Sequence, residues 1–112
     1  MSSPKKVLVG DGDPIVLALI CHILNRQGFT TNPVTDRDEL LRLMKEGVFD
    51  AILVDAAIEG VVDAIASAPE PQRAILLTTS DQTWVGAYAT LRKPLEFDVL
   101  IETVRNCTKG ES

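Results

Sequence analysis

The chain has 112 residues, of which 46% are apolar and 24% charged, a composition that excludes a disordered or fibrous protein. Eleven basic and 16 acidic side chains give a formal net charge of −5, which argues against binding nucleic acid or an anionic membrane through a basic surface. No apolar run approaches the ~20 residues of a membrane span. We expect one domain over 1–112, with a core of about 5–107 and polar tails at 1–4 and 108–112.

The two cysteines, Cys21 and Cys107, are far apart and belong to no Cys-x-x-Cys or Cys/His metal-ligand pattern. Isolated cysteines without a disulfide framework are typical of a reducing compartment. We therefore expect a cytoplasmic protein.

The first half of the chain alternates short apolar runs with helical stripes. A strand is expected over 7–9 and a helix over 14–27, with Asp13 as its N-cap and Gly28 as its stop signal. The apolar stripe of this helix consists of Val16, Leu19, Ile20, Ile23 and Leu24. A weaker strand over 29–32 precedes a second helix over 35–45, which opens at Thr35 with a variant of the capping box.

The second half continues this alternation. Continuous apolar runs over 51–54 and 74–77 are typical of strands that are covered on both faces. A shorter helix is expected between them, over 59–68. A weaker strand over 88–91 precedes a last helix over 96–107.

The regular alternation of strands and helices predicts an α/β protein. The expected architecture is a doubly wound, five-stranded parallel sheet with helices on both faces and right-handed crossovers. In such sheets, ligands bind outside the carboxyl ends of the strands. The residues that follow each strand are therefore the candidates for function.

Four polar residues stand at these strand ends: Asp11, Asp55, Thr78 and Lys93. Each has an ordinary explanation when taken alone, as a loop, turn or surface residue. Together they would meet at one edge of the sheet. Grouped carboxylates suit a hard divalent cation such as Mg²⁺, and a lysine with a hydroxyl suits a phosphoryl group.

With these residues in place, the chain resembles the receiver domains of bacterial two-component response regulators, over about residues 5–107. The resemblance rests on four motifs in order, Val7-Leu8-Val9-Gly10-Asp11, Phe49-Asp50-Ala51-Ile52-Leu53-Val54-Asp55, Ile75-Leu76-Leu77-Thr78 and Leu91-Arg92-Lys93-Pro94. It implies the flavodoxin-like strand order 2-1-3-4-5. It also implies a cis bond between Lys93 and Pro94.

The resemblance implies a role for each residue. Asp55 is the phosphoacceptor, which receives a phosphoryl group from a histidine kinase or phosphotransfer protein. Asp11, Asp55 and the backbone carbonyl of Ala57 hold Mg²⁺, whereas Thr78 and Lys93 bind the phosphoryl group. The domain then signals through contacts with a downstream protein whose identity the sequence does not reveal.

Three positions depart from the family's pattern. Gly12 replaces the second acidic residue, so we expect weakened Mg²⁺ affinity. Thr90 replaces the aromatic residue that moves inward during switching, so that switch must be altered or absent. Thr79 is bulkier than the small residue usual there, and it should crowd the approach of hydrolytic water.

The segment between Thr78 and Lys93 is shorter than in the family. Residues 81–87 have room for about two turns of helix at most, so the family's fourth helix is expected to be rudimentary or missing. Trp84 falls in this segment, where it is either a lid over a thinned core or, with Tyr88, part of a partner surface.

Two other functions stay open. The same fold could serve as a pseudo-receiver that binds partners without phosphorylation, which Gly12 and Thr90 favour. More remotely, Asp11-Gly12-Asp13 after the first strand resembles the haloacid-dehalogenase-like phosphatases, with Asp11 as nucleophile and Asp13 as acid/base. Under the leading hypothesis the domain is not an enzyme beyond self-phosphorylation and slow self-dephosphorylation.

Overall fold

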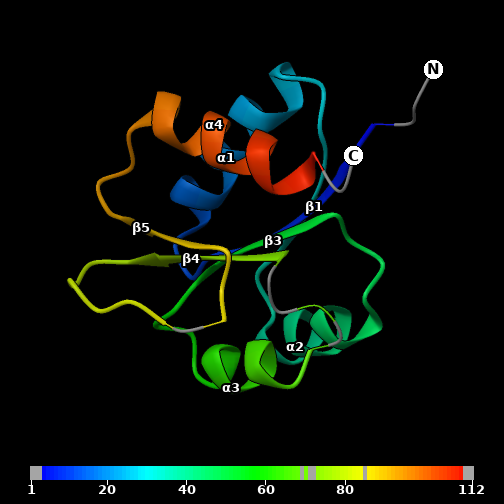
Figure 1. The fold of residues 1–112 in the computed structure, drawn as a ribbon, viewed down its shortest axis with the longest axis vertical. Helices are drawn as coiled ribbons and strands as arrows, with labels where there is room; N and C mark the ends of the chain where they lie inside the picture. Colours follow the sequence, from blue (N-terminus) through cyan, green and yellow to red (C-terminus); the bar gives the residue numbers. More distant parts are fainter. Residues whose placement is uncertain (1–3, 69, 71–72, 85, 110–112) are drawn as a thin grey trace.

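The computed structural model describes residues 4–68, 70, 73–84 and 86–109. It contains a five-stranded, all-parallel sheet in the order β2-β1-β3-β4-β5, as the sequence predicted (Figure 1). The strands are β1 (Lys6–Gly10), β2 (Thr30–Val34), β3 (Ala51–Asp55), β4 (Ala74–Thr78) and β5 (Ala89–Arg92). The helices are α1 (Pro14–Arg26), α2 (Arg37–Glu46), α3 (Val61–Ala66) and α4 (Phe97–Thr108).

The helices cover both faces of the sheet, with α1 and α4 on one face and α2 and α3 on the other (Figure 1). Alternate residues of each buried strand supply the two cores: Val7 and Val9 pack with α1 and α4, and Leu8 packs with α2 and α3. The strands are therefore apolar on both sides, which explains their continuous apolar runs. None of the helices in the described residues is long and apolar enough to cross a bilayer.

Aspartate caps set the starts of α1 and α2. Asp13 caps α1, where its carboxylate accepts a hydrogen bond from the Ile15 amide, as predicted. In α2 the prediction of Thr35 as the opening residue was wrong, because Asp36 caps the helix by accepting from the Glu39 amide at 3.0 Å. The helix therefore begins at Arg37.

Three boundaries and one helix face differ from the sequence expectation. β2 runs on to Val34, through a proline that an edge strand tolerates because it has no partner on its outer side. α4 runs on to Thr108, which lies inside the expected tail but is buried. α3 is shorter than expected. The buried face of α1 consists of Leu17, Ile20, Cys21 and Leu24, and Leu19 is 43% exposed.

The connection between β4 and β5 contains no helix in its described residues, 79–84 and 86–88. Trp84 is half-buried there and packs on the core under α2 and α3, together with Ala87. An ion pair between Arg92 and Asp81 fastens the connection to β5. The missing helix thus agrees with the short spacing, and Trp84 covers the sheet as the lid interpretation proposed.

Candidate functional site

Lys93 joins two carboxylates at the carboxyl ends of the strands. Its ammonium lies 2.8 Å from Oδ2 of Asp11, which follows β1, and 2.8 Å from Oδ2 of Asp55, the last residue of β3. Its backbone amide donates to the carbonyl of Thr78 at 2.7 Å, which anchors it to the end of β4. Three of the predicted site residues are therefore in direct contact, and the fourth adjoins them through this backbone bond.

The second oxygen of each carboxylate is held by a backbone amide. The Asp13 amide donates to Oδ1 of Asp11 at 2.9 Å, and the Ala57 amide donates to Oδ1 of Asp55 at 2.8 Å. The Asp11 side chain is 1% exposed, whereas that of Asp55 is 17% exposed. Asp55 is thus the carboxylate of this pair that a substrate reaches more easily.

Two carboxylates face one ammonium, so the cluster carries one negative charge. Burial, the largest single influence, lowers the pKa of Lys93, but hydrogen bonds to Asp11 and Asp55 and their charges together outweigh it and raise that pKa above its ordinary value. Lys93 is therefore a cation at neutral pH. It partly offsets the repulsion between the two carboxylates.

The Thr78 hydroxyl is engaged with Ser80. Thr78 is buried, and its Oγ1 accepts from the Ser80 amide at 3.1 Å and lies 3.1 Å from Ser80 Oγ. In the described part of the chain, these are the hydrogen bonds of the Thr78 side chain. A threonine at a strand end can close a turn in this way, by accepting from the amide two residues on.

The surroundings of Asp11 and Asp55 bear on the predicted magnesium site. Among the described residues, no three His, Cys, Asp or Glu side chains group as a metal centre. Asp13 turns its carboxylate to the α1 N-terminus and does not replace the missing acid. A Cβ built on Gly12 would have no neighbour within 4 Å, so this position has open space around it.

The proposed surface and switch residues lie elsewhere. Tyr88 is 44% exposed, and Thr79 is exposed. Thr90 is half-buried and pairs with Leu76 in the sheet register. Among the described residues, Trp84, Tyr88 and Thr90 form no hydrogen bond or ion pair with the carboxylate cluster.

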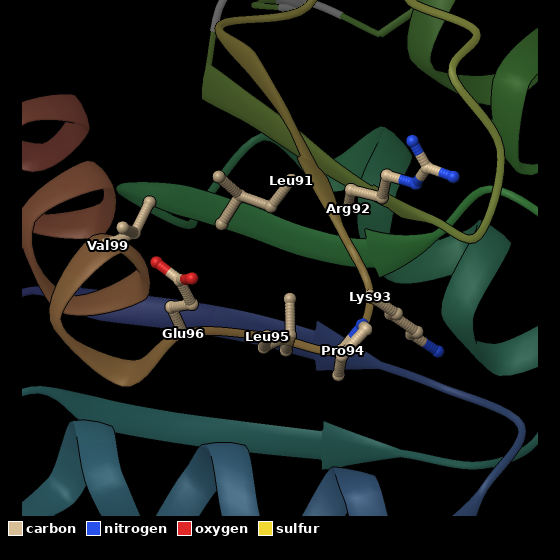
Figure 2. Close-up of a pocket in the computed structure, with 7 residues that line it drawn as sticks. All are labelled: Leu91, Arg92, Lys93, Pro94, Leu95, Glu96 and Val99. Carbon is tan, nitrogen blue, oxygen red and sulfur yellow. The ribbon is translucent and has the colours of Figure 1, made fainter.

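A groove of 560 Å³ lies beside the cluster rather than in it, along β5 and the start of α4. Figure 2 shows that Leu91, Glu96 and Val99 line one side of this groove, whereas the Lys93 side chain extends away from them. Size alone therefore does not locate the chemistry. The polar contacts of Lys93 instead connect the predicted site residues Asp11 and Asp55.

Replacing Lys93 by glutamine should destabilise the fold by about 2 kcal/mol, because it leaves two carboxylates facing each other without a cation. The matched variant Asp55→Asn leaves a neutral pair of Lys93 and Asp11, so its unfolding free energy should stay near that of the wild type. Urea unfolding at pH 7 measures both. A stable Lys93→Gln protein beside a strongly destabilised Asp55→Asn protein would contradict this electrostatic account.

Comparisons with known proteins give the same fold. No protein-family model matches the sequence, and no curated protein matches it. The structure is similar to a Clostridium thermocellum response regulator receiver domain (TM-score 0.79, 22% identity, 94% of each chain). It is also similar to the receiver domain of Francisella response regulator 1452 (TM-score 0.78, 25% identity, 94% of this chain and 97% of that one).

A third similar structure is the receiver domain of the Pseudomonas aeruginosa sensor histidine kinase PA1611, which has a magnesium ion coordinated in its active site cleft. The TM-score is 0.80 at 19% identity, over 96% of this chain and 100% of that one. These three neighbours are receiver domains of response regulators or of a sensor histidine kinase. The chain has the fold of the response regulator receiver domains.

Proposed function

We propose that this domain is a phosphoacceptor in two-component signalling and that Asp55 receives the phosphoryl group from a phosphohistidine of a histidine kinase or phosphotransfer protein. The observation that carries this proposal is the contact of Asp55 with Lys93 at an accessible edge of the sheet. A nucleophilic carboxylate needs to be accessible, and it needs a nearby cation to balance the negative charge of the incoming phosphoryl group. Asp55 meets both requirements.

In the proposed reaction, a carboxylate oxygen of Asp55 forms a bond to phosphorus while the phosphorus–nitrogen bond breaks, and the imidazole leaves with the electron pair. The Ala57 amide holds Oδ1 of Asp55 and so fixes the orientation of the carboxylate. Lys93, which contacts Asp55, would pair with the phosphoryl oxygens, and Thr78 would donate to one of them.

The donor set fits Mg²⁺ with fewer protein ligands than a site with three acids. The hard carboxylate oxygens of Asp11 and Asp55 and the carbonyl of Ala57 would hold the ion, and waters would complete its coordination. When bound, Mg²⁺ supplies positive charge to the transferring phosphoryl group. The open space at Gly12 favours a water at the position of the missing carboxylate.

The alternatives are less well supported by the same contacts. A phosphatase with Asp11 as nucleophile would need that carboxylate to be accessible, but it is 1% exposed. Asp13, the acid/base of that scheme, caps α1. A pseudo-receiver would need neither the Lys93 contact nor the buried Thr78. We further propose a cytoplasmic setting, because Cys21 and Cys107 are free thiols.

Incubation with Mg²⁺ and acetyl phosphate, followed by intact mass spectrometry, tests the proposal. The wild type should gain one phosphoryl group, and Asp55→Asn should gain none, because the nucleophile is lost. Asp11→Asn is the matched control, and it should retain some labelling. Label that disappears with Asp11 rather than Asp55 would favour the phosphatase. An unlabelled wild type would favour the pseudo-receiver.

Gly12→Asp should bind Mg²⁺ about ten- to a hundredfold more tightly than the wild type, because a carboxylate adds a ligand and a negative charge. A Cβ at this position would have no neighbour within 4 Å. Gly12→Asn, with a similar shape but no charge, is the control. A Mg²⁺ titration followed through the amide shifts of residues 11–13 measures the change. Equal affinities for wild type and Gly12→Asp would contradict the weakened-site hypothesis.

We propose that the β4–β5 connection, with Trp84 and Tyr88, carries the signal to a partner, because Thr90 has no ring to move and the described residues of the connection form no helix. Beryllofluoride, a phosphoryl mimic, should then shift the amides of residues 55–60 and 78–88 and leave α4 nearly unchanged. Residue-resolved amide spectra with and without the mimic measure this. Large shifts along α4 would instead mean that the family's usual surface is used.

A further inference from the structure

The Thr78 hydroxyl has a limited number of hydrogen-bonding positions. A hydroxyl offers one proton and two acceptor lone pairs. One lone pair of Thr78 Oγ1 already accepts from the Ser80 amide. The contact with Ser80 Oγ, at 3.1 Å, takes either the second lone pair or the proton, since either oxygen can be the donor.

The chemistry of a phosphoryl group decides between the two directions. Ionised phosphoryl oxygens accept hydrogen bonds and have no proton to offer. Thr78 can therefore bind one only by donating its proton, so in the bound state Ser80 Oγ must donate to Thr78. This requires no movement of Ser80, because its amide contact and its hydroxyl contact are both already formed.

The backbone beyond Ser80 supports this direction. The Gln82 amide donates to Ser80 Oγ at 3.2 Å, which occupies a lone pair of that oxygen and holds the side chain in place. The hydrogen bonds then run one way, from the Gln82 amide through Ser80 to Thr78. Bonds in such a chain polarise one another, so Thr78 becomes a better donor.

We propose that Ser80 is a positioning residue, which fills both acceptor positions of Thr78 Oγ1 and leaves the Thr78 proton for a phosphoryl oxygen. This inference rests on the proposed function. Ser80 acts through Thr78 and does not itself touch the phosphoryl group. The exposed side of Ser80 gives room for substitutions that leave the core undisturbed.

Beryllofluoride affinity in the presence of Mg²⁺, measured by calorimetry, tests the proposal. Ser80→Ala keeps the amide bond to Thr78 but loses the hydroxyl, and it should weaken binding about three- to tenfold. Ser80→Thr keeps a hydroxyl and should bind like the wild type. In a Thr78→Val background, Ser80→Ala should cause no further loss, because the group on which Ser80 acts is gone.

The outcomes separate this inference from the proposed function. An unchanged or tighter affinity in Ser80→Ala would overturn the positioning role, and so would an equal loss in the Thr78→Val background, which would mean a direct contact. A wild type that binds no beryllofluoride would overturn the proposed function and this inference with it. Binding by the wild type without an effect of Ser80→Ala would overturn the inference alone.

Discussion

The contact of Lys93 with Asp11 and Asp55 is the constraint on which the site depends. β1 and β3 are neighbours in register, with Gly10 beside Val54, so the residues that follow must place two carboxylates side by side. Their repulsion needs a cation, and the ammonium comes from the edge of the sheet, where Lys93 follows β5. The strand order therefore determines the charge arrangement, and the charge arrangement determines what the site binds.

The predictable part of the site is the part that the strands position. Asp11, Asp55 and Lys93 could be found from sequence because each stands at or just past the end of a predicted strand, and the carboxyl ends of parallel strands meet at one edge. The hydrogen bonds between Ser80 and Thr78 could not, because they depend on the path of a loop that periodicity does not describe. Asp36 was missed as a cap because the adjacent Thr35 offers the same chemistry one residue earlier.

The strand and helix order of the fold was predictable from the sequence, whereas the buried face of α1 was not. Alternation of strands and helices gives the topology, but the orientation of a helix also depends on its neighbours. α1 packs against both the sheet and α4, so its buried face turns toward Leu17 and Cys21, and Leu19 is left outside. The apolar stripe of one helix, when it is read from sequence alone, does not take account of the contact with α4. The described residues of the β4–β5 connection form no helix, which was foreseen because the number of residues limits a helix more strictly than their helix propensity does.

The position of Trp84 has an optical consequence. It is the protein's one tryptophan, and its indole rests partly on the core beneath the β4–β5 connection. An indole that leaves an apolar contact for water emits at longer wavelength. Because the sequence holds no second indole, the tryptophan emission of this protein reports on the packing of that connection against the core.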